Sequence, residues 1–295
     1  MSDRETDYDV IVVGGGPSGA TAAHEIALAG HKVLLLERAF RIKPCGGAIP
    51  PCILGEFDIP RSLLKAEIQS ARMISPKVQK VDMPIEGTFV GMVDRDEFDP
   101  WLRLRAQRAG ADLELAAFKK VEYIDKTTLR VTYVSKDHET ETRTATARCV
   151  LGADGARSQV ARQGIPKHAD VPWVLAYHEI VEAPEAATED YDPERCEVWY
   201  QGGLSPDFYA WVFPHGKSAS IGVGSAHKDF SAKKSVNQLR AISGLDTAET
   251  IRKEGAPIPM KPMKRWDDGK AVLVSGDAAG VVAPASGDGI YYAML

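Results

Sequence analysis

The sequence has 295 residues, of which 44% are hydrophobic and 26% are charged, a composition typical of a soluble globular protein. At roughly 150 residues per domain, this length allows about two domains. The formal net charge of −5 argues against a nucleic-acid binder, because such proteins neutralise phosphates with a basic surface.

The four cysteines are scattered, and none forms a CxxC pair or lies near a cluster of histidines. We therefore expect reduced thiols in a cytosolic protein, with neither a disulfide framework nor a metal site. The N-terminal stretch MSDRETDYDV is acidic and polar, unlike the apolar core of a signal peptide. No apolar run approaches the roughly 18 residues of a membrane-spanning helix, so we expect any membrane contact to be peripheral.

The first forty residues follow the order strand, glycine turn, helix, strand and acid. Residues 8–13 are a β-branched run, residues 14–19 read GGGPSG, and residues 20–29 are rich in alanine. A second apolar run at residues 32–36 ends at Glu37. This pattern predicts a dinucleotide-binding βαβ unit.

Each part of this unit has a physical role. Gly14 permits the tight turn, Gly16 lets the backbone approach a pyrophosphate, and Gly19 allows the helix to pack closely on the strand. The helix N-terminus offers N–H groups to phosphates, and the acid accepts hydrogen bonds from a ribose diol. The motif favours NAD or FAD over NADP and does not choose between the two. The expected cofactor-binding residues here are Gly14, Gly16, Pro17, Ser18, Gly19, Glu37 and Arg38.

Two later segments each combine the end of an apolar strand with a Gly-Asp or Asp-Gly pair. Residues 150–158 read VLGADGARS and residues 271–280 read AVLVSGDAAG. Asp277 is expected at the carboxyl end of a strand beside a helix N-terminus, where ligands of α/β sheets gather. Taken separately, each pair is explained as well by a turn or a helix N-cap without any ligand as by a ligand site.

Together with the N-terminal unit, these segments resemble the flavin-hydroxylase-like family and its DG and GD motifs. The resemblance implies an α/β fold with a Rossmann-type, p-hydroxybenzoate-hydroxylase-like FAD-binding domain and an inserted antiparallel β-sheet substrate domain. It also implies that Asp277 binds the ribityl chain of FAD. Gly289 and Ile290 would present backbone N–H groups toward the flavin ring.

Further stretches are similar to the geranylgeranyl reductases, which saturate isoprenoid double bonds. Residues 41–51 read RIKPCGGAIPP, and residues 209–224 fit the pattern YxWxFPx7GxG. SARMISPKVQKVDMP and GDAAGVVAPASGDGIYYAM resemble the geranylgeranyl reductases of chlorophyll and bacteriochlorophyll synthesis, although Asp288 stands where that family is expected to have Glu. The resemblance covers nearly the whole chain. Relatives continue beyond residue 295 with a mostly helical region, so we expect a C-terminally truncated chain whose activity is in doubt.

The resemblance implies a substrate pocket along the aromatic strand. Alternate residues of a strand share one face, so Tyr209, Trp211 and Phe213 should line a long apolar pocket, with Trp199 contributing from another strand. From spacing alone, this face reads as domain core. The expected substrate-binding residues are Tyr209, Trp211, Phe213, Pro214, Gly222 and Gly224.

Cys45 lies in a glycine loop with Gly46 and Gly47. The resemblance implies that this loop lies by the flavin, where Cys45 would assist proton delivery or flavin positioning as the catalytic residue, and that all three residues bind the cofactor. A loop thiol of no consequence is the alternative. The other three cysteines are assigned to packing.

Arg95, just before an expected helix, matches an FAD-contacting arginine of the family. A surface ion pair with Asp94 or Glu97 explains it equally well. We expect no catalytic role for the histidines of the first helix, of a presumed strand and of the turn after Pro214, namely His24, His178 and His215.

The chain is expected to form a discontinuous FAD-binding domain and a smaller substrate domain. The first comprises residues 1–70, 91–165 and 262–295, and the second comprises residues 71–90 and 166–261. Period-two patterns predict antiparallel strands at 196–201, 208–213 and 218–223, and helices are expected at 99–110 and 235–243. The acidic stretch 182–193 predicts a loop, and residues 255–262, with three prolines, predict a linker.

The sequence thus predicts an FAD-dependent oxidoreductase that reduces geranylgeranyl double bonds stepwise to phytyl. The substrate would be a (bacterio)chlorophyll ester or free geranylgeranyl diphosphate, and the resemblance implies NADPH as reductant, with ferredoxin as the alternative donor. A reductase of archaeal-type lipids or other isoprenoids, a flavin hydroxylase and an inactive fragment are the rival hypotheses. We expect a cytoplasmic protein in peripheral contact with the photosynthetic or cytoplasmic membrane, and oligomeric state is left open.

Overall fold

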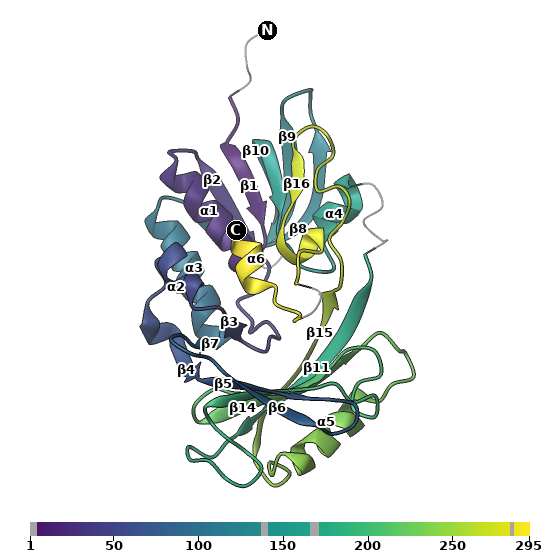
Figure 1. Ribbon diagram of the computed structural model, residues 1–295. Coiled ribbons are helices and arrows are strands. Elements are labelled where there is room, and N and C mark those ends of the chain that lie inside the picture. Colours follow the sequence, from purple (N-terminus) through teal and green to yellow (C-terminus); the bar gives the residue numbers. More distant parts are fainter. Residues whose placement is uncertain (1–4, 137–140, 166–170, 284–285) are drawn as a thin grey trace. The chain divides into compact units, whose positions relative to one another are not determined.

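The computed structural model describes residues 5–136, 141–165, 171–283 and 286–295. The chain forms two compact units, each assembled from separate stretches of sequence. Unit 1 comprises residues 1–42, 98–172 and 259–295, and unit 2 comprises residues 43–97 and 173–258. Figure 1 labels the elements of both units.

Unit 1 combines a parallel sheet with helices packed on its faces. Its elements are β1 (Tyr8–Val13), α1 (Pro17–Leu28), β2 (Val33–Glu37), α3 (Arg95–Arg108, whose first turn belongs to unit 2), β8 (Asp112–Tyr123), β9 (Leu129–Ser135), β10 (Thr142–Gly152), α4 (Gln159–Gly164), β16 (Val272–Val274), the 3-10 helix η3 (Gly276–Ala279) and α6 (Ile290–Met294).

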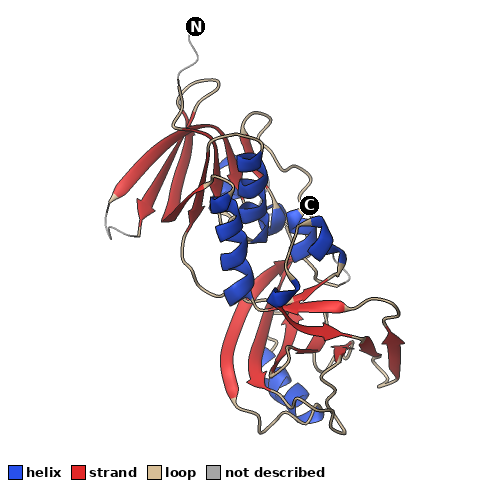
Figure 2. Cartoon of the chain, turned by 90° about the vertical axis from the view of Figure 1, so that its left-hand side faces the viewer, coloured by secondary structure: helices blue, strands red, loops and turns tan. Residues whose placement is uncertain are grey.

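The parallel strands of unit 1 lie in the order β8, β2, β1, β10, β16. In the centre, Val12 lies opposite Leu35 on one side and Leu151 on the other. These strands are near-continuous apolar runs because both faces of a parallel sheet are covered, and Figure 2 shows helices lying along it. Strand β9 pairs antiparallel with the second half of β8 and with the first half of β10. The predicted βαβ unit is therefore present, followed by a three-stranded antiparallel extension.

Helix α1 begins at Pro17, earlier than the alanine run alone indicated. Pro17 occupies the first turn, where its missing N–H costs nothing, and Gly16 is the N-cap. The helix ends before Gly30, whose φ of +84° is the left-handed conformation that stops a helix. The glycine turn thus delivers the chain directly from β1 into the helix N-terminus.

Unit 2 is mainly antiparallel sheet. Its elements are β3 (Ala48–Ile49), α2 (Cys52–Glu56), η1 (Arg61–Leu63), β4 (Leu64–Ile68), β5 (Ser70–Ile74), β6 (Lys80–Pro84), β7 (Val90–Val93), β11 (Trp173–Glu182), β12 (Arg195–Trp199), β13 (Ala210–Pro214), β14 (Ser218–Ser225), α5 (Ala232–Ile242) and β15 (Thr250–Pro259, which ends in unit 1).

The large sheet of unit 2 has seven strands in the order β15, β11, β14, β13, β12, β5, β6, and a small sheet has the order β3, β7, β4. The expected strands at 196–201, 208–213 and 218–223 correspond to β12, β13 and β14. Their pairings are antiparallel, but β12 pairs with β5 in parallel. One face of the large sheet forms a core with α5, in which Val212 and Ile221 pack with Val236 and Leu239.

The units differ from the expected domain boundaries. Residues 43–70 and 91–97, expected in the FAD-binding domain, belong to unit 2. The reason is the small sheet, whose Ile68 and Met92 share a buried cluster with Cys196 of β12.

The expected linker at 255–262 was wrong for its first half. Residues 255–259 continue β15. Their prolines are tolerated because β15 lies at the edge of the sheet, where a missing N–H breaks no ladder.

Candidate functional site

In unit 1 the glycine turn is packed backbone against backbone. A Cβ on Gly14 would lie 2.3 Å from the carbonyl oxygen of Ala153, and one on Gly19 would lie 1.9 Å from the carbonyl oxygen of Gly14. Gly14 also has a φ of +107°. Only glycine fits at these two positions, so the end of β1, the start of α1 and the end of β10 meet without intervening side chains.

Glu37, at the end of β2, is 4% exposed and faces the same turn. Its Oε2 accepts the N–H of Gly15 at 2.7 Å, and its Oε1 accepts the N–H of Ala39 at 3.1 Å. These two bonds orient the carboxylate at the end of β2, beside the glycine turn.

Arg103 of α3 is a residue that the sequence reasoning missed. Its Nη1 donates to the Gly15 carbonyl at 3.1 Å, and its guanidinium lies 4.9 Å from the centre of the Phe40 ring. The side chain is only 6% exposed. An arginine inside an expected helix carries no signal that it reaches a turn 88 residues away.

Asp154, in the Asp-Gly pair, lies between β10 and helix α4, whose N-cap is Ser158. Asp154 accepts hydrogen bonds from the Ser158 hydroxyl and from the Gln159 N–H, while Ser158 accepts the Ala161 N–H at 2.8 Å. Burial raises the pKa of Asp154 despite these hydrogen bonds. The Asp154 carboxylate therefore binds the first turn of α4 without being its N-cap residue.

The Gly-Asp pair at Asp277 lies beside the start of α1. Ser18 and Ser275 share a hydrogen bond of 2.7 Å between their hydroxyls, and a Cβ on Gly276 would lie 2.9 Å from the Cβ of Ser18. Asp277 is exposed, and a Cβ on Gly289 would lie 3.5 Å from its Oδ1. Segments 257 residues apart in the chain thus meet at one helix N-terminus.

The resulting site in unit 1 suits a dinucleotide. The N-terminus of α1 has no side-chain cap among the described residues, so its first N–H groups can face phosphates. Glu37 places a carboxylate beside the glycine turn, and Gly276 of the Gly-Asp pair packs against Ser18 of α1. Arg38 is exposed just after β2. Contact of these residues with a cofactor stays a prediction.

In unit 2 the aromatic side chains of β13 form a row on the face away from α5. Tyr209 and Trp211 have ring centres 6.0 Å apart, and Trp211 and Phe213 have ring centres 6.2 Å apart. Tyr209 and Trp211 are 8% and 5% exposed. We call Tyr209, Trp211 and Phe213 the aromatic row.

The paired glycines of the motif make room for these rings. A Cβ on Gly222, directly opposite Trp211, would lie 2.2 Å from the indole, and a Cβ on Gly224 would lie 2.6 Å from the Phe208 ring. Pro214 ends β13 opposite Ala219 and is buried. The YxWxFPx7GxG pattern therefore has a packing basis: rings on one strand lie over bare backbone on the next.

Trp199 was wrongly expected to join this row. It packs in the core beside α5 with Val212, on the opposite face, because its neighbour Val198 is the residue paired with Trp211. A period-two pattern shows which residues of one strand share a face. It does not show which residues of the neighbouring strand lie on that same face.

A buried polar network lies behind the aromatic row. Trp211 Nε1 donates to the Ser220 hydroxyl at 3.1 Å, and His178 Nδ1 lies 2.9 Å from the same oxygen. His178 Nε2 lies 3.0 Å from Glu254 Oε2, an ion-pair distance without hydrogen-bond alignment. Burial opposes ionisation of Glu254, but His178 and Arg252 together hold its pKa below the usual value.

The Cys45 loop lies against the aromatic row within unit 2. A Cβ on Gly46 would lie 3.1 Å from the Phe213 ring and 3.8 Å from Trp211 Nε1. Cys45 is half-buried, and its Sγ accepts the Gly47 N–H at 3.3 Å. The structure therefore brings the catalytic candidate next to the expected substrate-binding side chains.

His215 was expected to be a histidine without a special role, yet it is buried and holds this loop. Its Nδ1 lies 2.8 Å from Asp94 Oδ1 and its Nε2 lies 3.0 Å from the Gly46 carbonyl oxygen. The turn after Pro214 gave no signal for these contacts, since both partners lie more than 100 residues away in the chain. Arg95, the neighbour of Asp94, is half-buried in unit 2, and its role at a cofactor stays a prediction.

Two negative findings concern the described residues alone. Within them, no helix has the length and apolar character needed to cross a bilayer. Nor does that part of the chain gather three or more His, Cys, Asp or Glu side chains in an arrangement that could hold a metal ion.

Comparison with protein families agrees with this geometry. The model of an FAD-binding domain matches residues 61–295, and that of the FAD-dependent oxidoreductases matches residues 9–48. The chain is 57% identical to geranylgeranyl diphosphate reductase of Rhodobacter capsulatus over 97% of this chain and 72% of the relative. It is 38% identical to the chloroplastic enzyme of that name from rice over 96% of this chain and 63% of the relative.

A digeranylgeranylglycerophospholipid reductase of Methanopyrus kandleri is 32% identical over 98% of this chain and 78% of the relative. A geranylgeranyl bacteriochlorophyll reductase-like protein of Thermoplasma acidophilum has a TM-score of 0.87 at 27% identity, over 97% of this chain and 75% of that one. Aklavinone-11 hydroxylase has a TM-score of 0.74 at 18% identity, over 99% of this chain and 61% of that one, which indicates a shared fold. The expected flavin-hydroxylase-like fold is thus confirmed, and the chain belongs to the geranylgeranyl reductase family of FAD-binding oxidoreductases.

Proposed function

We propose that this chain binds FAD in unit 1 and reduces the carbon–carbon double bonds of a geranylgeranyl chain bound in unit 2, with NADPH as reductant. The observation that carries the proposal is the Cys45 loop seated on the aromatic row, in a chain 57% identical to a geranylgeranyl diphosphate reductase. The substrate is either the (bacterio)chlorophyll ester or free geranylgeranyl diphosphate, the two forms that the sequence left open.

The residues of unit 1 bind and orient the cofactor in this proposal. The N–H groups of Gly16, Ser18 and Gly19 face the pyrophosphate, and Glu37 accepts the ribose hydroxyls. Asp277 binds the ribityl chain, beside the N–H groups of Gly289 and Ile290. When bound and reduced, FAD supplies the hydride that an unactivated alkene requires.

The residues of unit 2 hold the isoprenoid and control protons. Tyr209, Trp211 and Phe213 give an apolar, aromatic surface on which a branched hydrocarbon chain is bound away from water. Reduction of one double bond needs one hydride and one proton, and Cys45 is the candidate for the proton or for its delivery. The net change per step is the gain of two hydrogens.

The test is mass spectrometry of geranylgeranyl-bacteriochlorophyllide after anaerobic incubation with the protein, FAD and NADPH. Successive gains of two hydrogens are the expected result. A version extended with the C-terminal region of a relative runs in parallel. If only the extended version reacts, reduction requires that region, and if neither reacts while both hold reduced flavin, the pigment assignment is wrong.

Two controls sharpen this test. Cys45→Ala should retain FAD and lose turnover, and normal turnover would remove Cys45 from the mechanism. Replacing NADPH with reduced ferredoxin tests the alternative donor.

A second candidate substrate is an archaeal-type lipid, favoured by the 32% identity to digeranylgeranylglycerophospholipid reductase. Incubation with digeranylgeranylglycerophospholipid under the same conditions separates the two. Faster reduction of the phospholipid than of the pigment would favour the second candidate.

A further inference from the structure

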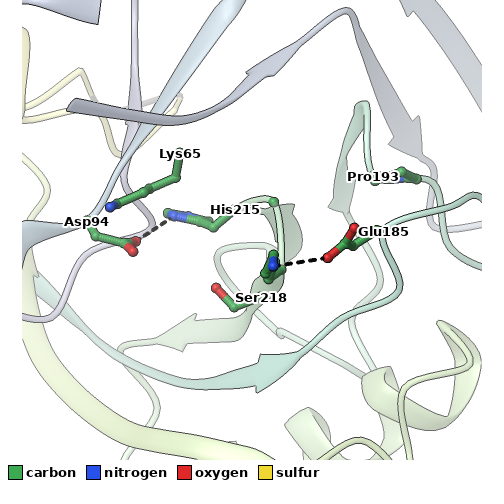
Figure 3. A pocket seen from close by; sticks show the side chains of 8 residues that line it. Lys65, Asp94, Glu185, Pro193, His215 and Ser218 are labelled. Carbon is green, nitrogen blue, oxygen red and sulfur yellow. Dashed lines mark hydrogen bonds and ion pairs between the residues drawn. The ribbon is translucent and has the colours of Figure 1, made fainter. Parts of the chain in front are cut away.

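Both ring nitrogens of His215 are engaged. Nδ1 lies 2.8 Å from Asp94 Oδ1, and Nε2 lies 3.0 Å from the Gly46 carbonyl oxygen. The side chain is only 4% exposed. Figure 3 shows the ring directed at Asp94, which comes from the segment just after β7. His215 itself follows the last residue of β13, so it joins two segments that are distant in sequence.

The partners of His215 determine its protonation. A backbone carbonyl accepts hydrogen bonds and cannot donate one, and the same is true of an ionised carboxylate. Burial opposes ionisation of Asp94, but the hydrogen bond from His215 and the nearby positive charges, among them Lys65 and Arg252, together hold the pKa of Asp94 below its usual value. With two acceptors as partners, both nitrogens must donate, and a ring that donates from both nitrogens is an imidazolium cation.

The loop that this cation holds is also restrained by a second hydrogen bond. The Val93 N–H donates to the Gly47 carbonyl at 2.9 Å, and Gly47 has a φ of +79°. A Cβ there would lie 2.4 Å from the Val93 carbonyl oxygen and 2.5 Å from the His215 ring. Consecutive carbonyls, those of Gly46 and Gly47, are thus bound by two different segments, which restrains the loop directly after Cys45.

We propose that His215 is a positioning residue: as an imidazolium cation held by Asp94, it fixes the Cys45–Gly47 loop against the aromatic row. Its consequence for catalysis rests on the reductase function proposed above. Its protonation state and its effect on the loop are independent of that function and are measured separately.

The surroundings of His215 are nearly balanced in charge. An open pocket of about 590 Å³, lined among others by Lys65, Asp94, His215 and Ser218, lets solvent reach this pair of side chains (Figure 3). Lys65 is ion-paired with Glu97, and Lys217 lies 3.5 Å from Glu185. The remaining charges near Asp94 on the facing strand β15 are Arg252 and its partner Glu254.

The first test is the side-chain nitrogen NMR spectrum of the uniformly 15N-labelled chain at neutral pH, with His215 assigned by its absence in His215→Gln. We expect two protonated nitrogens for His215. The spectrum of a neutral tautomer would overturn the proposal.

The second test is the rate at which iodoacetamide alkylates Cys45, measured by peptide mass spectrometry relative to the exposed Cys52 in the same sample. Loss of a charged hydrogen bond should raise this ratio about tenfold in His215→Gln. The same rise should occur in Asp94→Asn, because the anionic partner of the cation is gone.

The control is His227→Gln, an exposed histidine of the same unit, which should leave the ratio unchanged. Thermal unfolding of each variant shows whether it is folded, and Asp94→Asn keeps the test decisive if His215→Gln is not. Equal ratios in all three variants would overturn the proposal. Protection of Cys45 in a chain that reduces no isoprenoid would contradict the proposed function alone.

Discussion

The glycine turn of unit 1 and the aromatic row of unit 2 are built in opposite ways. At the turn, backbone meets backbone, and the space for a Cβ on Gly19 is already filled by the Gly14 carbonyl. Along the row, side chains meet side chains, and Trp211 is held by a hydrogen bond to Ser220 on the next strand. A site built from backbone should fail abruptly when any atom is added, whereas one built from side chains should weaken gradually.

Gly19→Ala should give the largest effect. The added methyl would lie 1.9 Å from a backbone oxygen that cannot move aside, so the loss should exceed the roughly 1–3 kcal/mol typical of overpacking. Flavin content after purification and the urea midpoint measure this. Gly55→Ala is the control, since no atom lies within 4 Å of the new methyl. Full flavin content in Gly19→Ala would contradict the backbone interpretation.

Gly222→Ala should have a smaller effect, confined to unit 2. Its methyl would lie 2.2 Å from the Trp211 indole, a side chain that can shift, so we expect destabilisation of about 2 kcal/mol and a change in tryptophan fluorescence. Gly203→Ala, with no atom within 4 Å, is the matched control. If Gly222→Ala lost flavin as completely as Gly19→Ala, the two regions would not differ in the proposed way.

Ser220→Ala should cost about 1 kcal/mol, because Trp211 Nε1 and His178 Nδ1 both lose a buried partner. Denaturant unfolding measures it. Ser243→Ala is a close control, since that hydroxyl is equally buried but has no hydrogen-bond partner among the described residues. Equal stability of the two variants would show that the network contributes nothing.

The smallest effect should be the pH dependence contributed by Asp94. The folded state lowers the pKa of Asp94 below its unfolded value of 3.8, so its stabilisation is present above that value and is lost as pH falls through the folded pKa. The stability gap between the unsubstituted chain and Asp94→Asn should therefore narrow in acid. Urea unfolding of both chains at several acidic pH values tests this, and a gap that stays constant in acid would contradict it.

The same contrast explains what the sequence could predict of the fold. The strand–turn–helix–strand order of residues 8–37 was predictable because each step is a local preference, and the chain forms β1, α1 and β2 there. The division of residues 43–70 and 91–97 between units was not, since it depends on Ile68 and Met92 meeting Cys196. The prolines of residues 255–262 indicated a linker, because proline is unfavourable inside a sheet. The sequence does not show that β15 lies at the edge of its sheet, where proline is tolerated.

The candidate site divides in the same way. The glycines of the turn and of the YxWxFPx7GxG pattern were found from spacing and resemblance, and packing accounts for Gly14, Gly19, Gly222 and Gly224. Arg103 and His215 were missed because the partners of each lie in segments distant in the chain. The alternation of side chains along β13 was predicted correctly, but Trp199 was placed on the wrong face. The sequence of a single strand does not determine its register with the neighbouring strand.

The central position of β1 has a consequence for biosynthesis. One of its neighbours, β2, follows it closely in the chain, whereas the other is β10, and Asp7 bonds to Thr146, 139 residues later. At roughly 5–20 residues per second, synthesis of the intervening chain takes about 7–28 s, during which one edge of β1 is unpaired. Strand β10 pairs with β9 as well as with β1, so this edge is covered only after the β9–β10 hairpin has been synthesised.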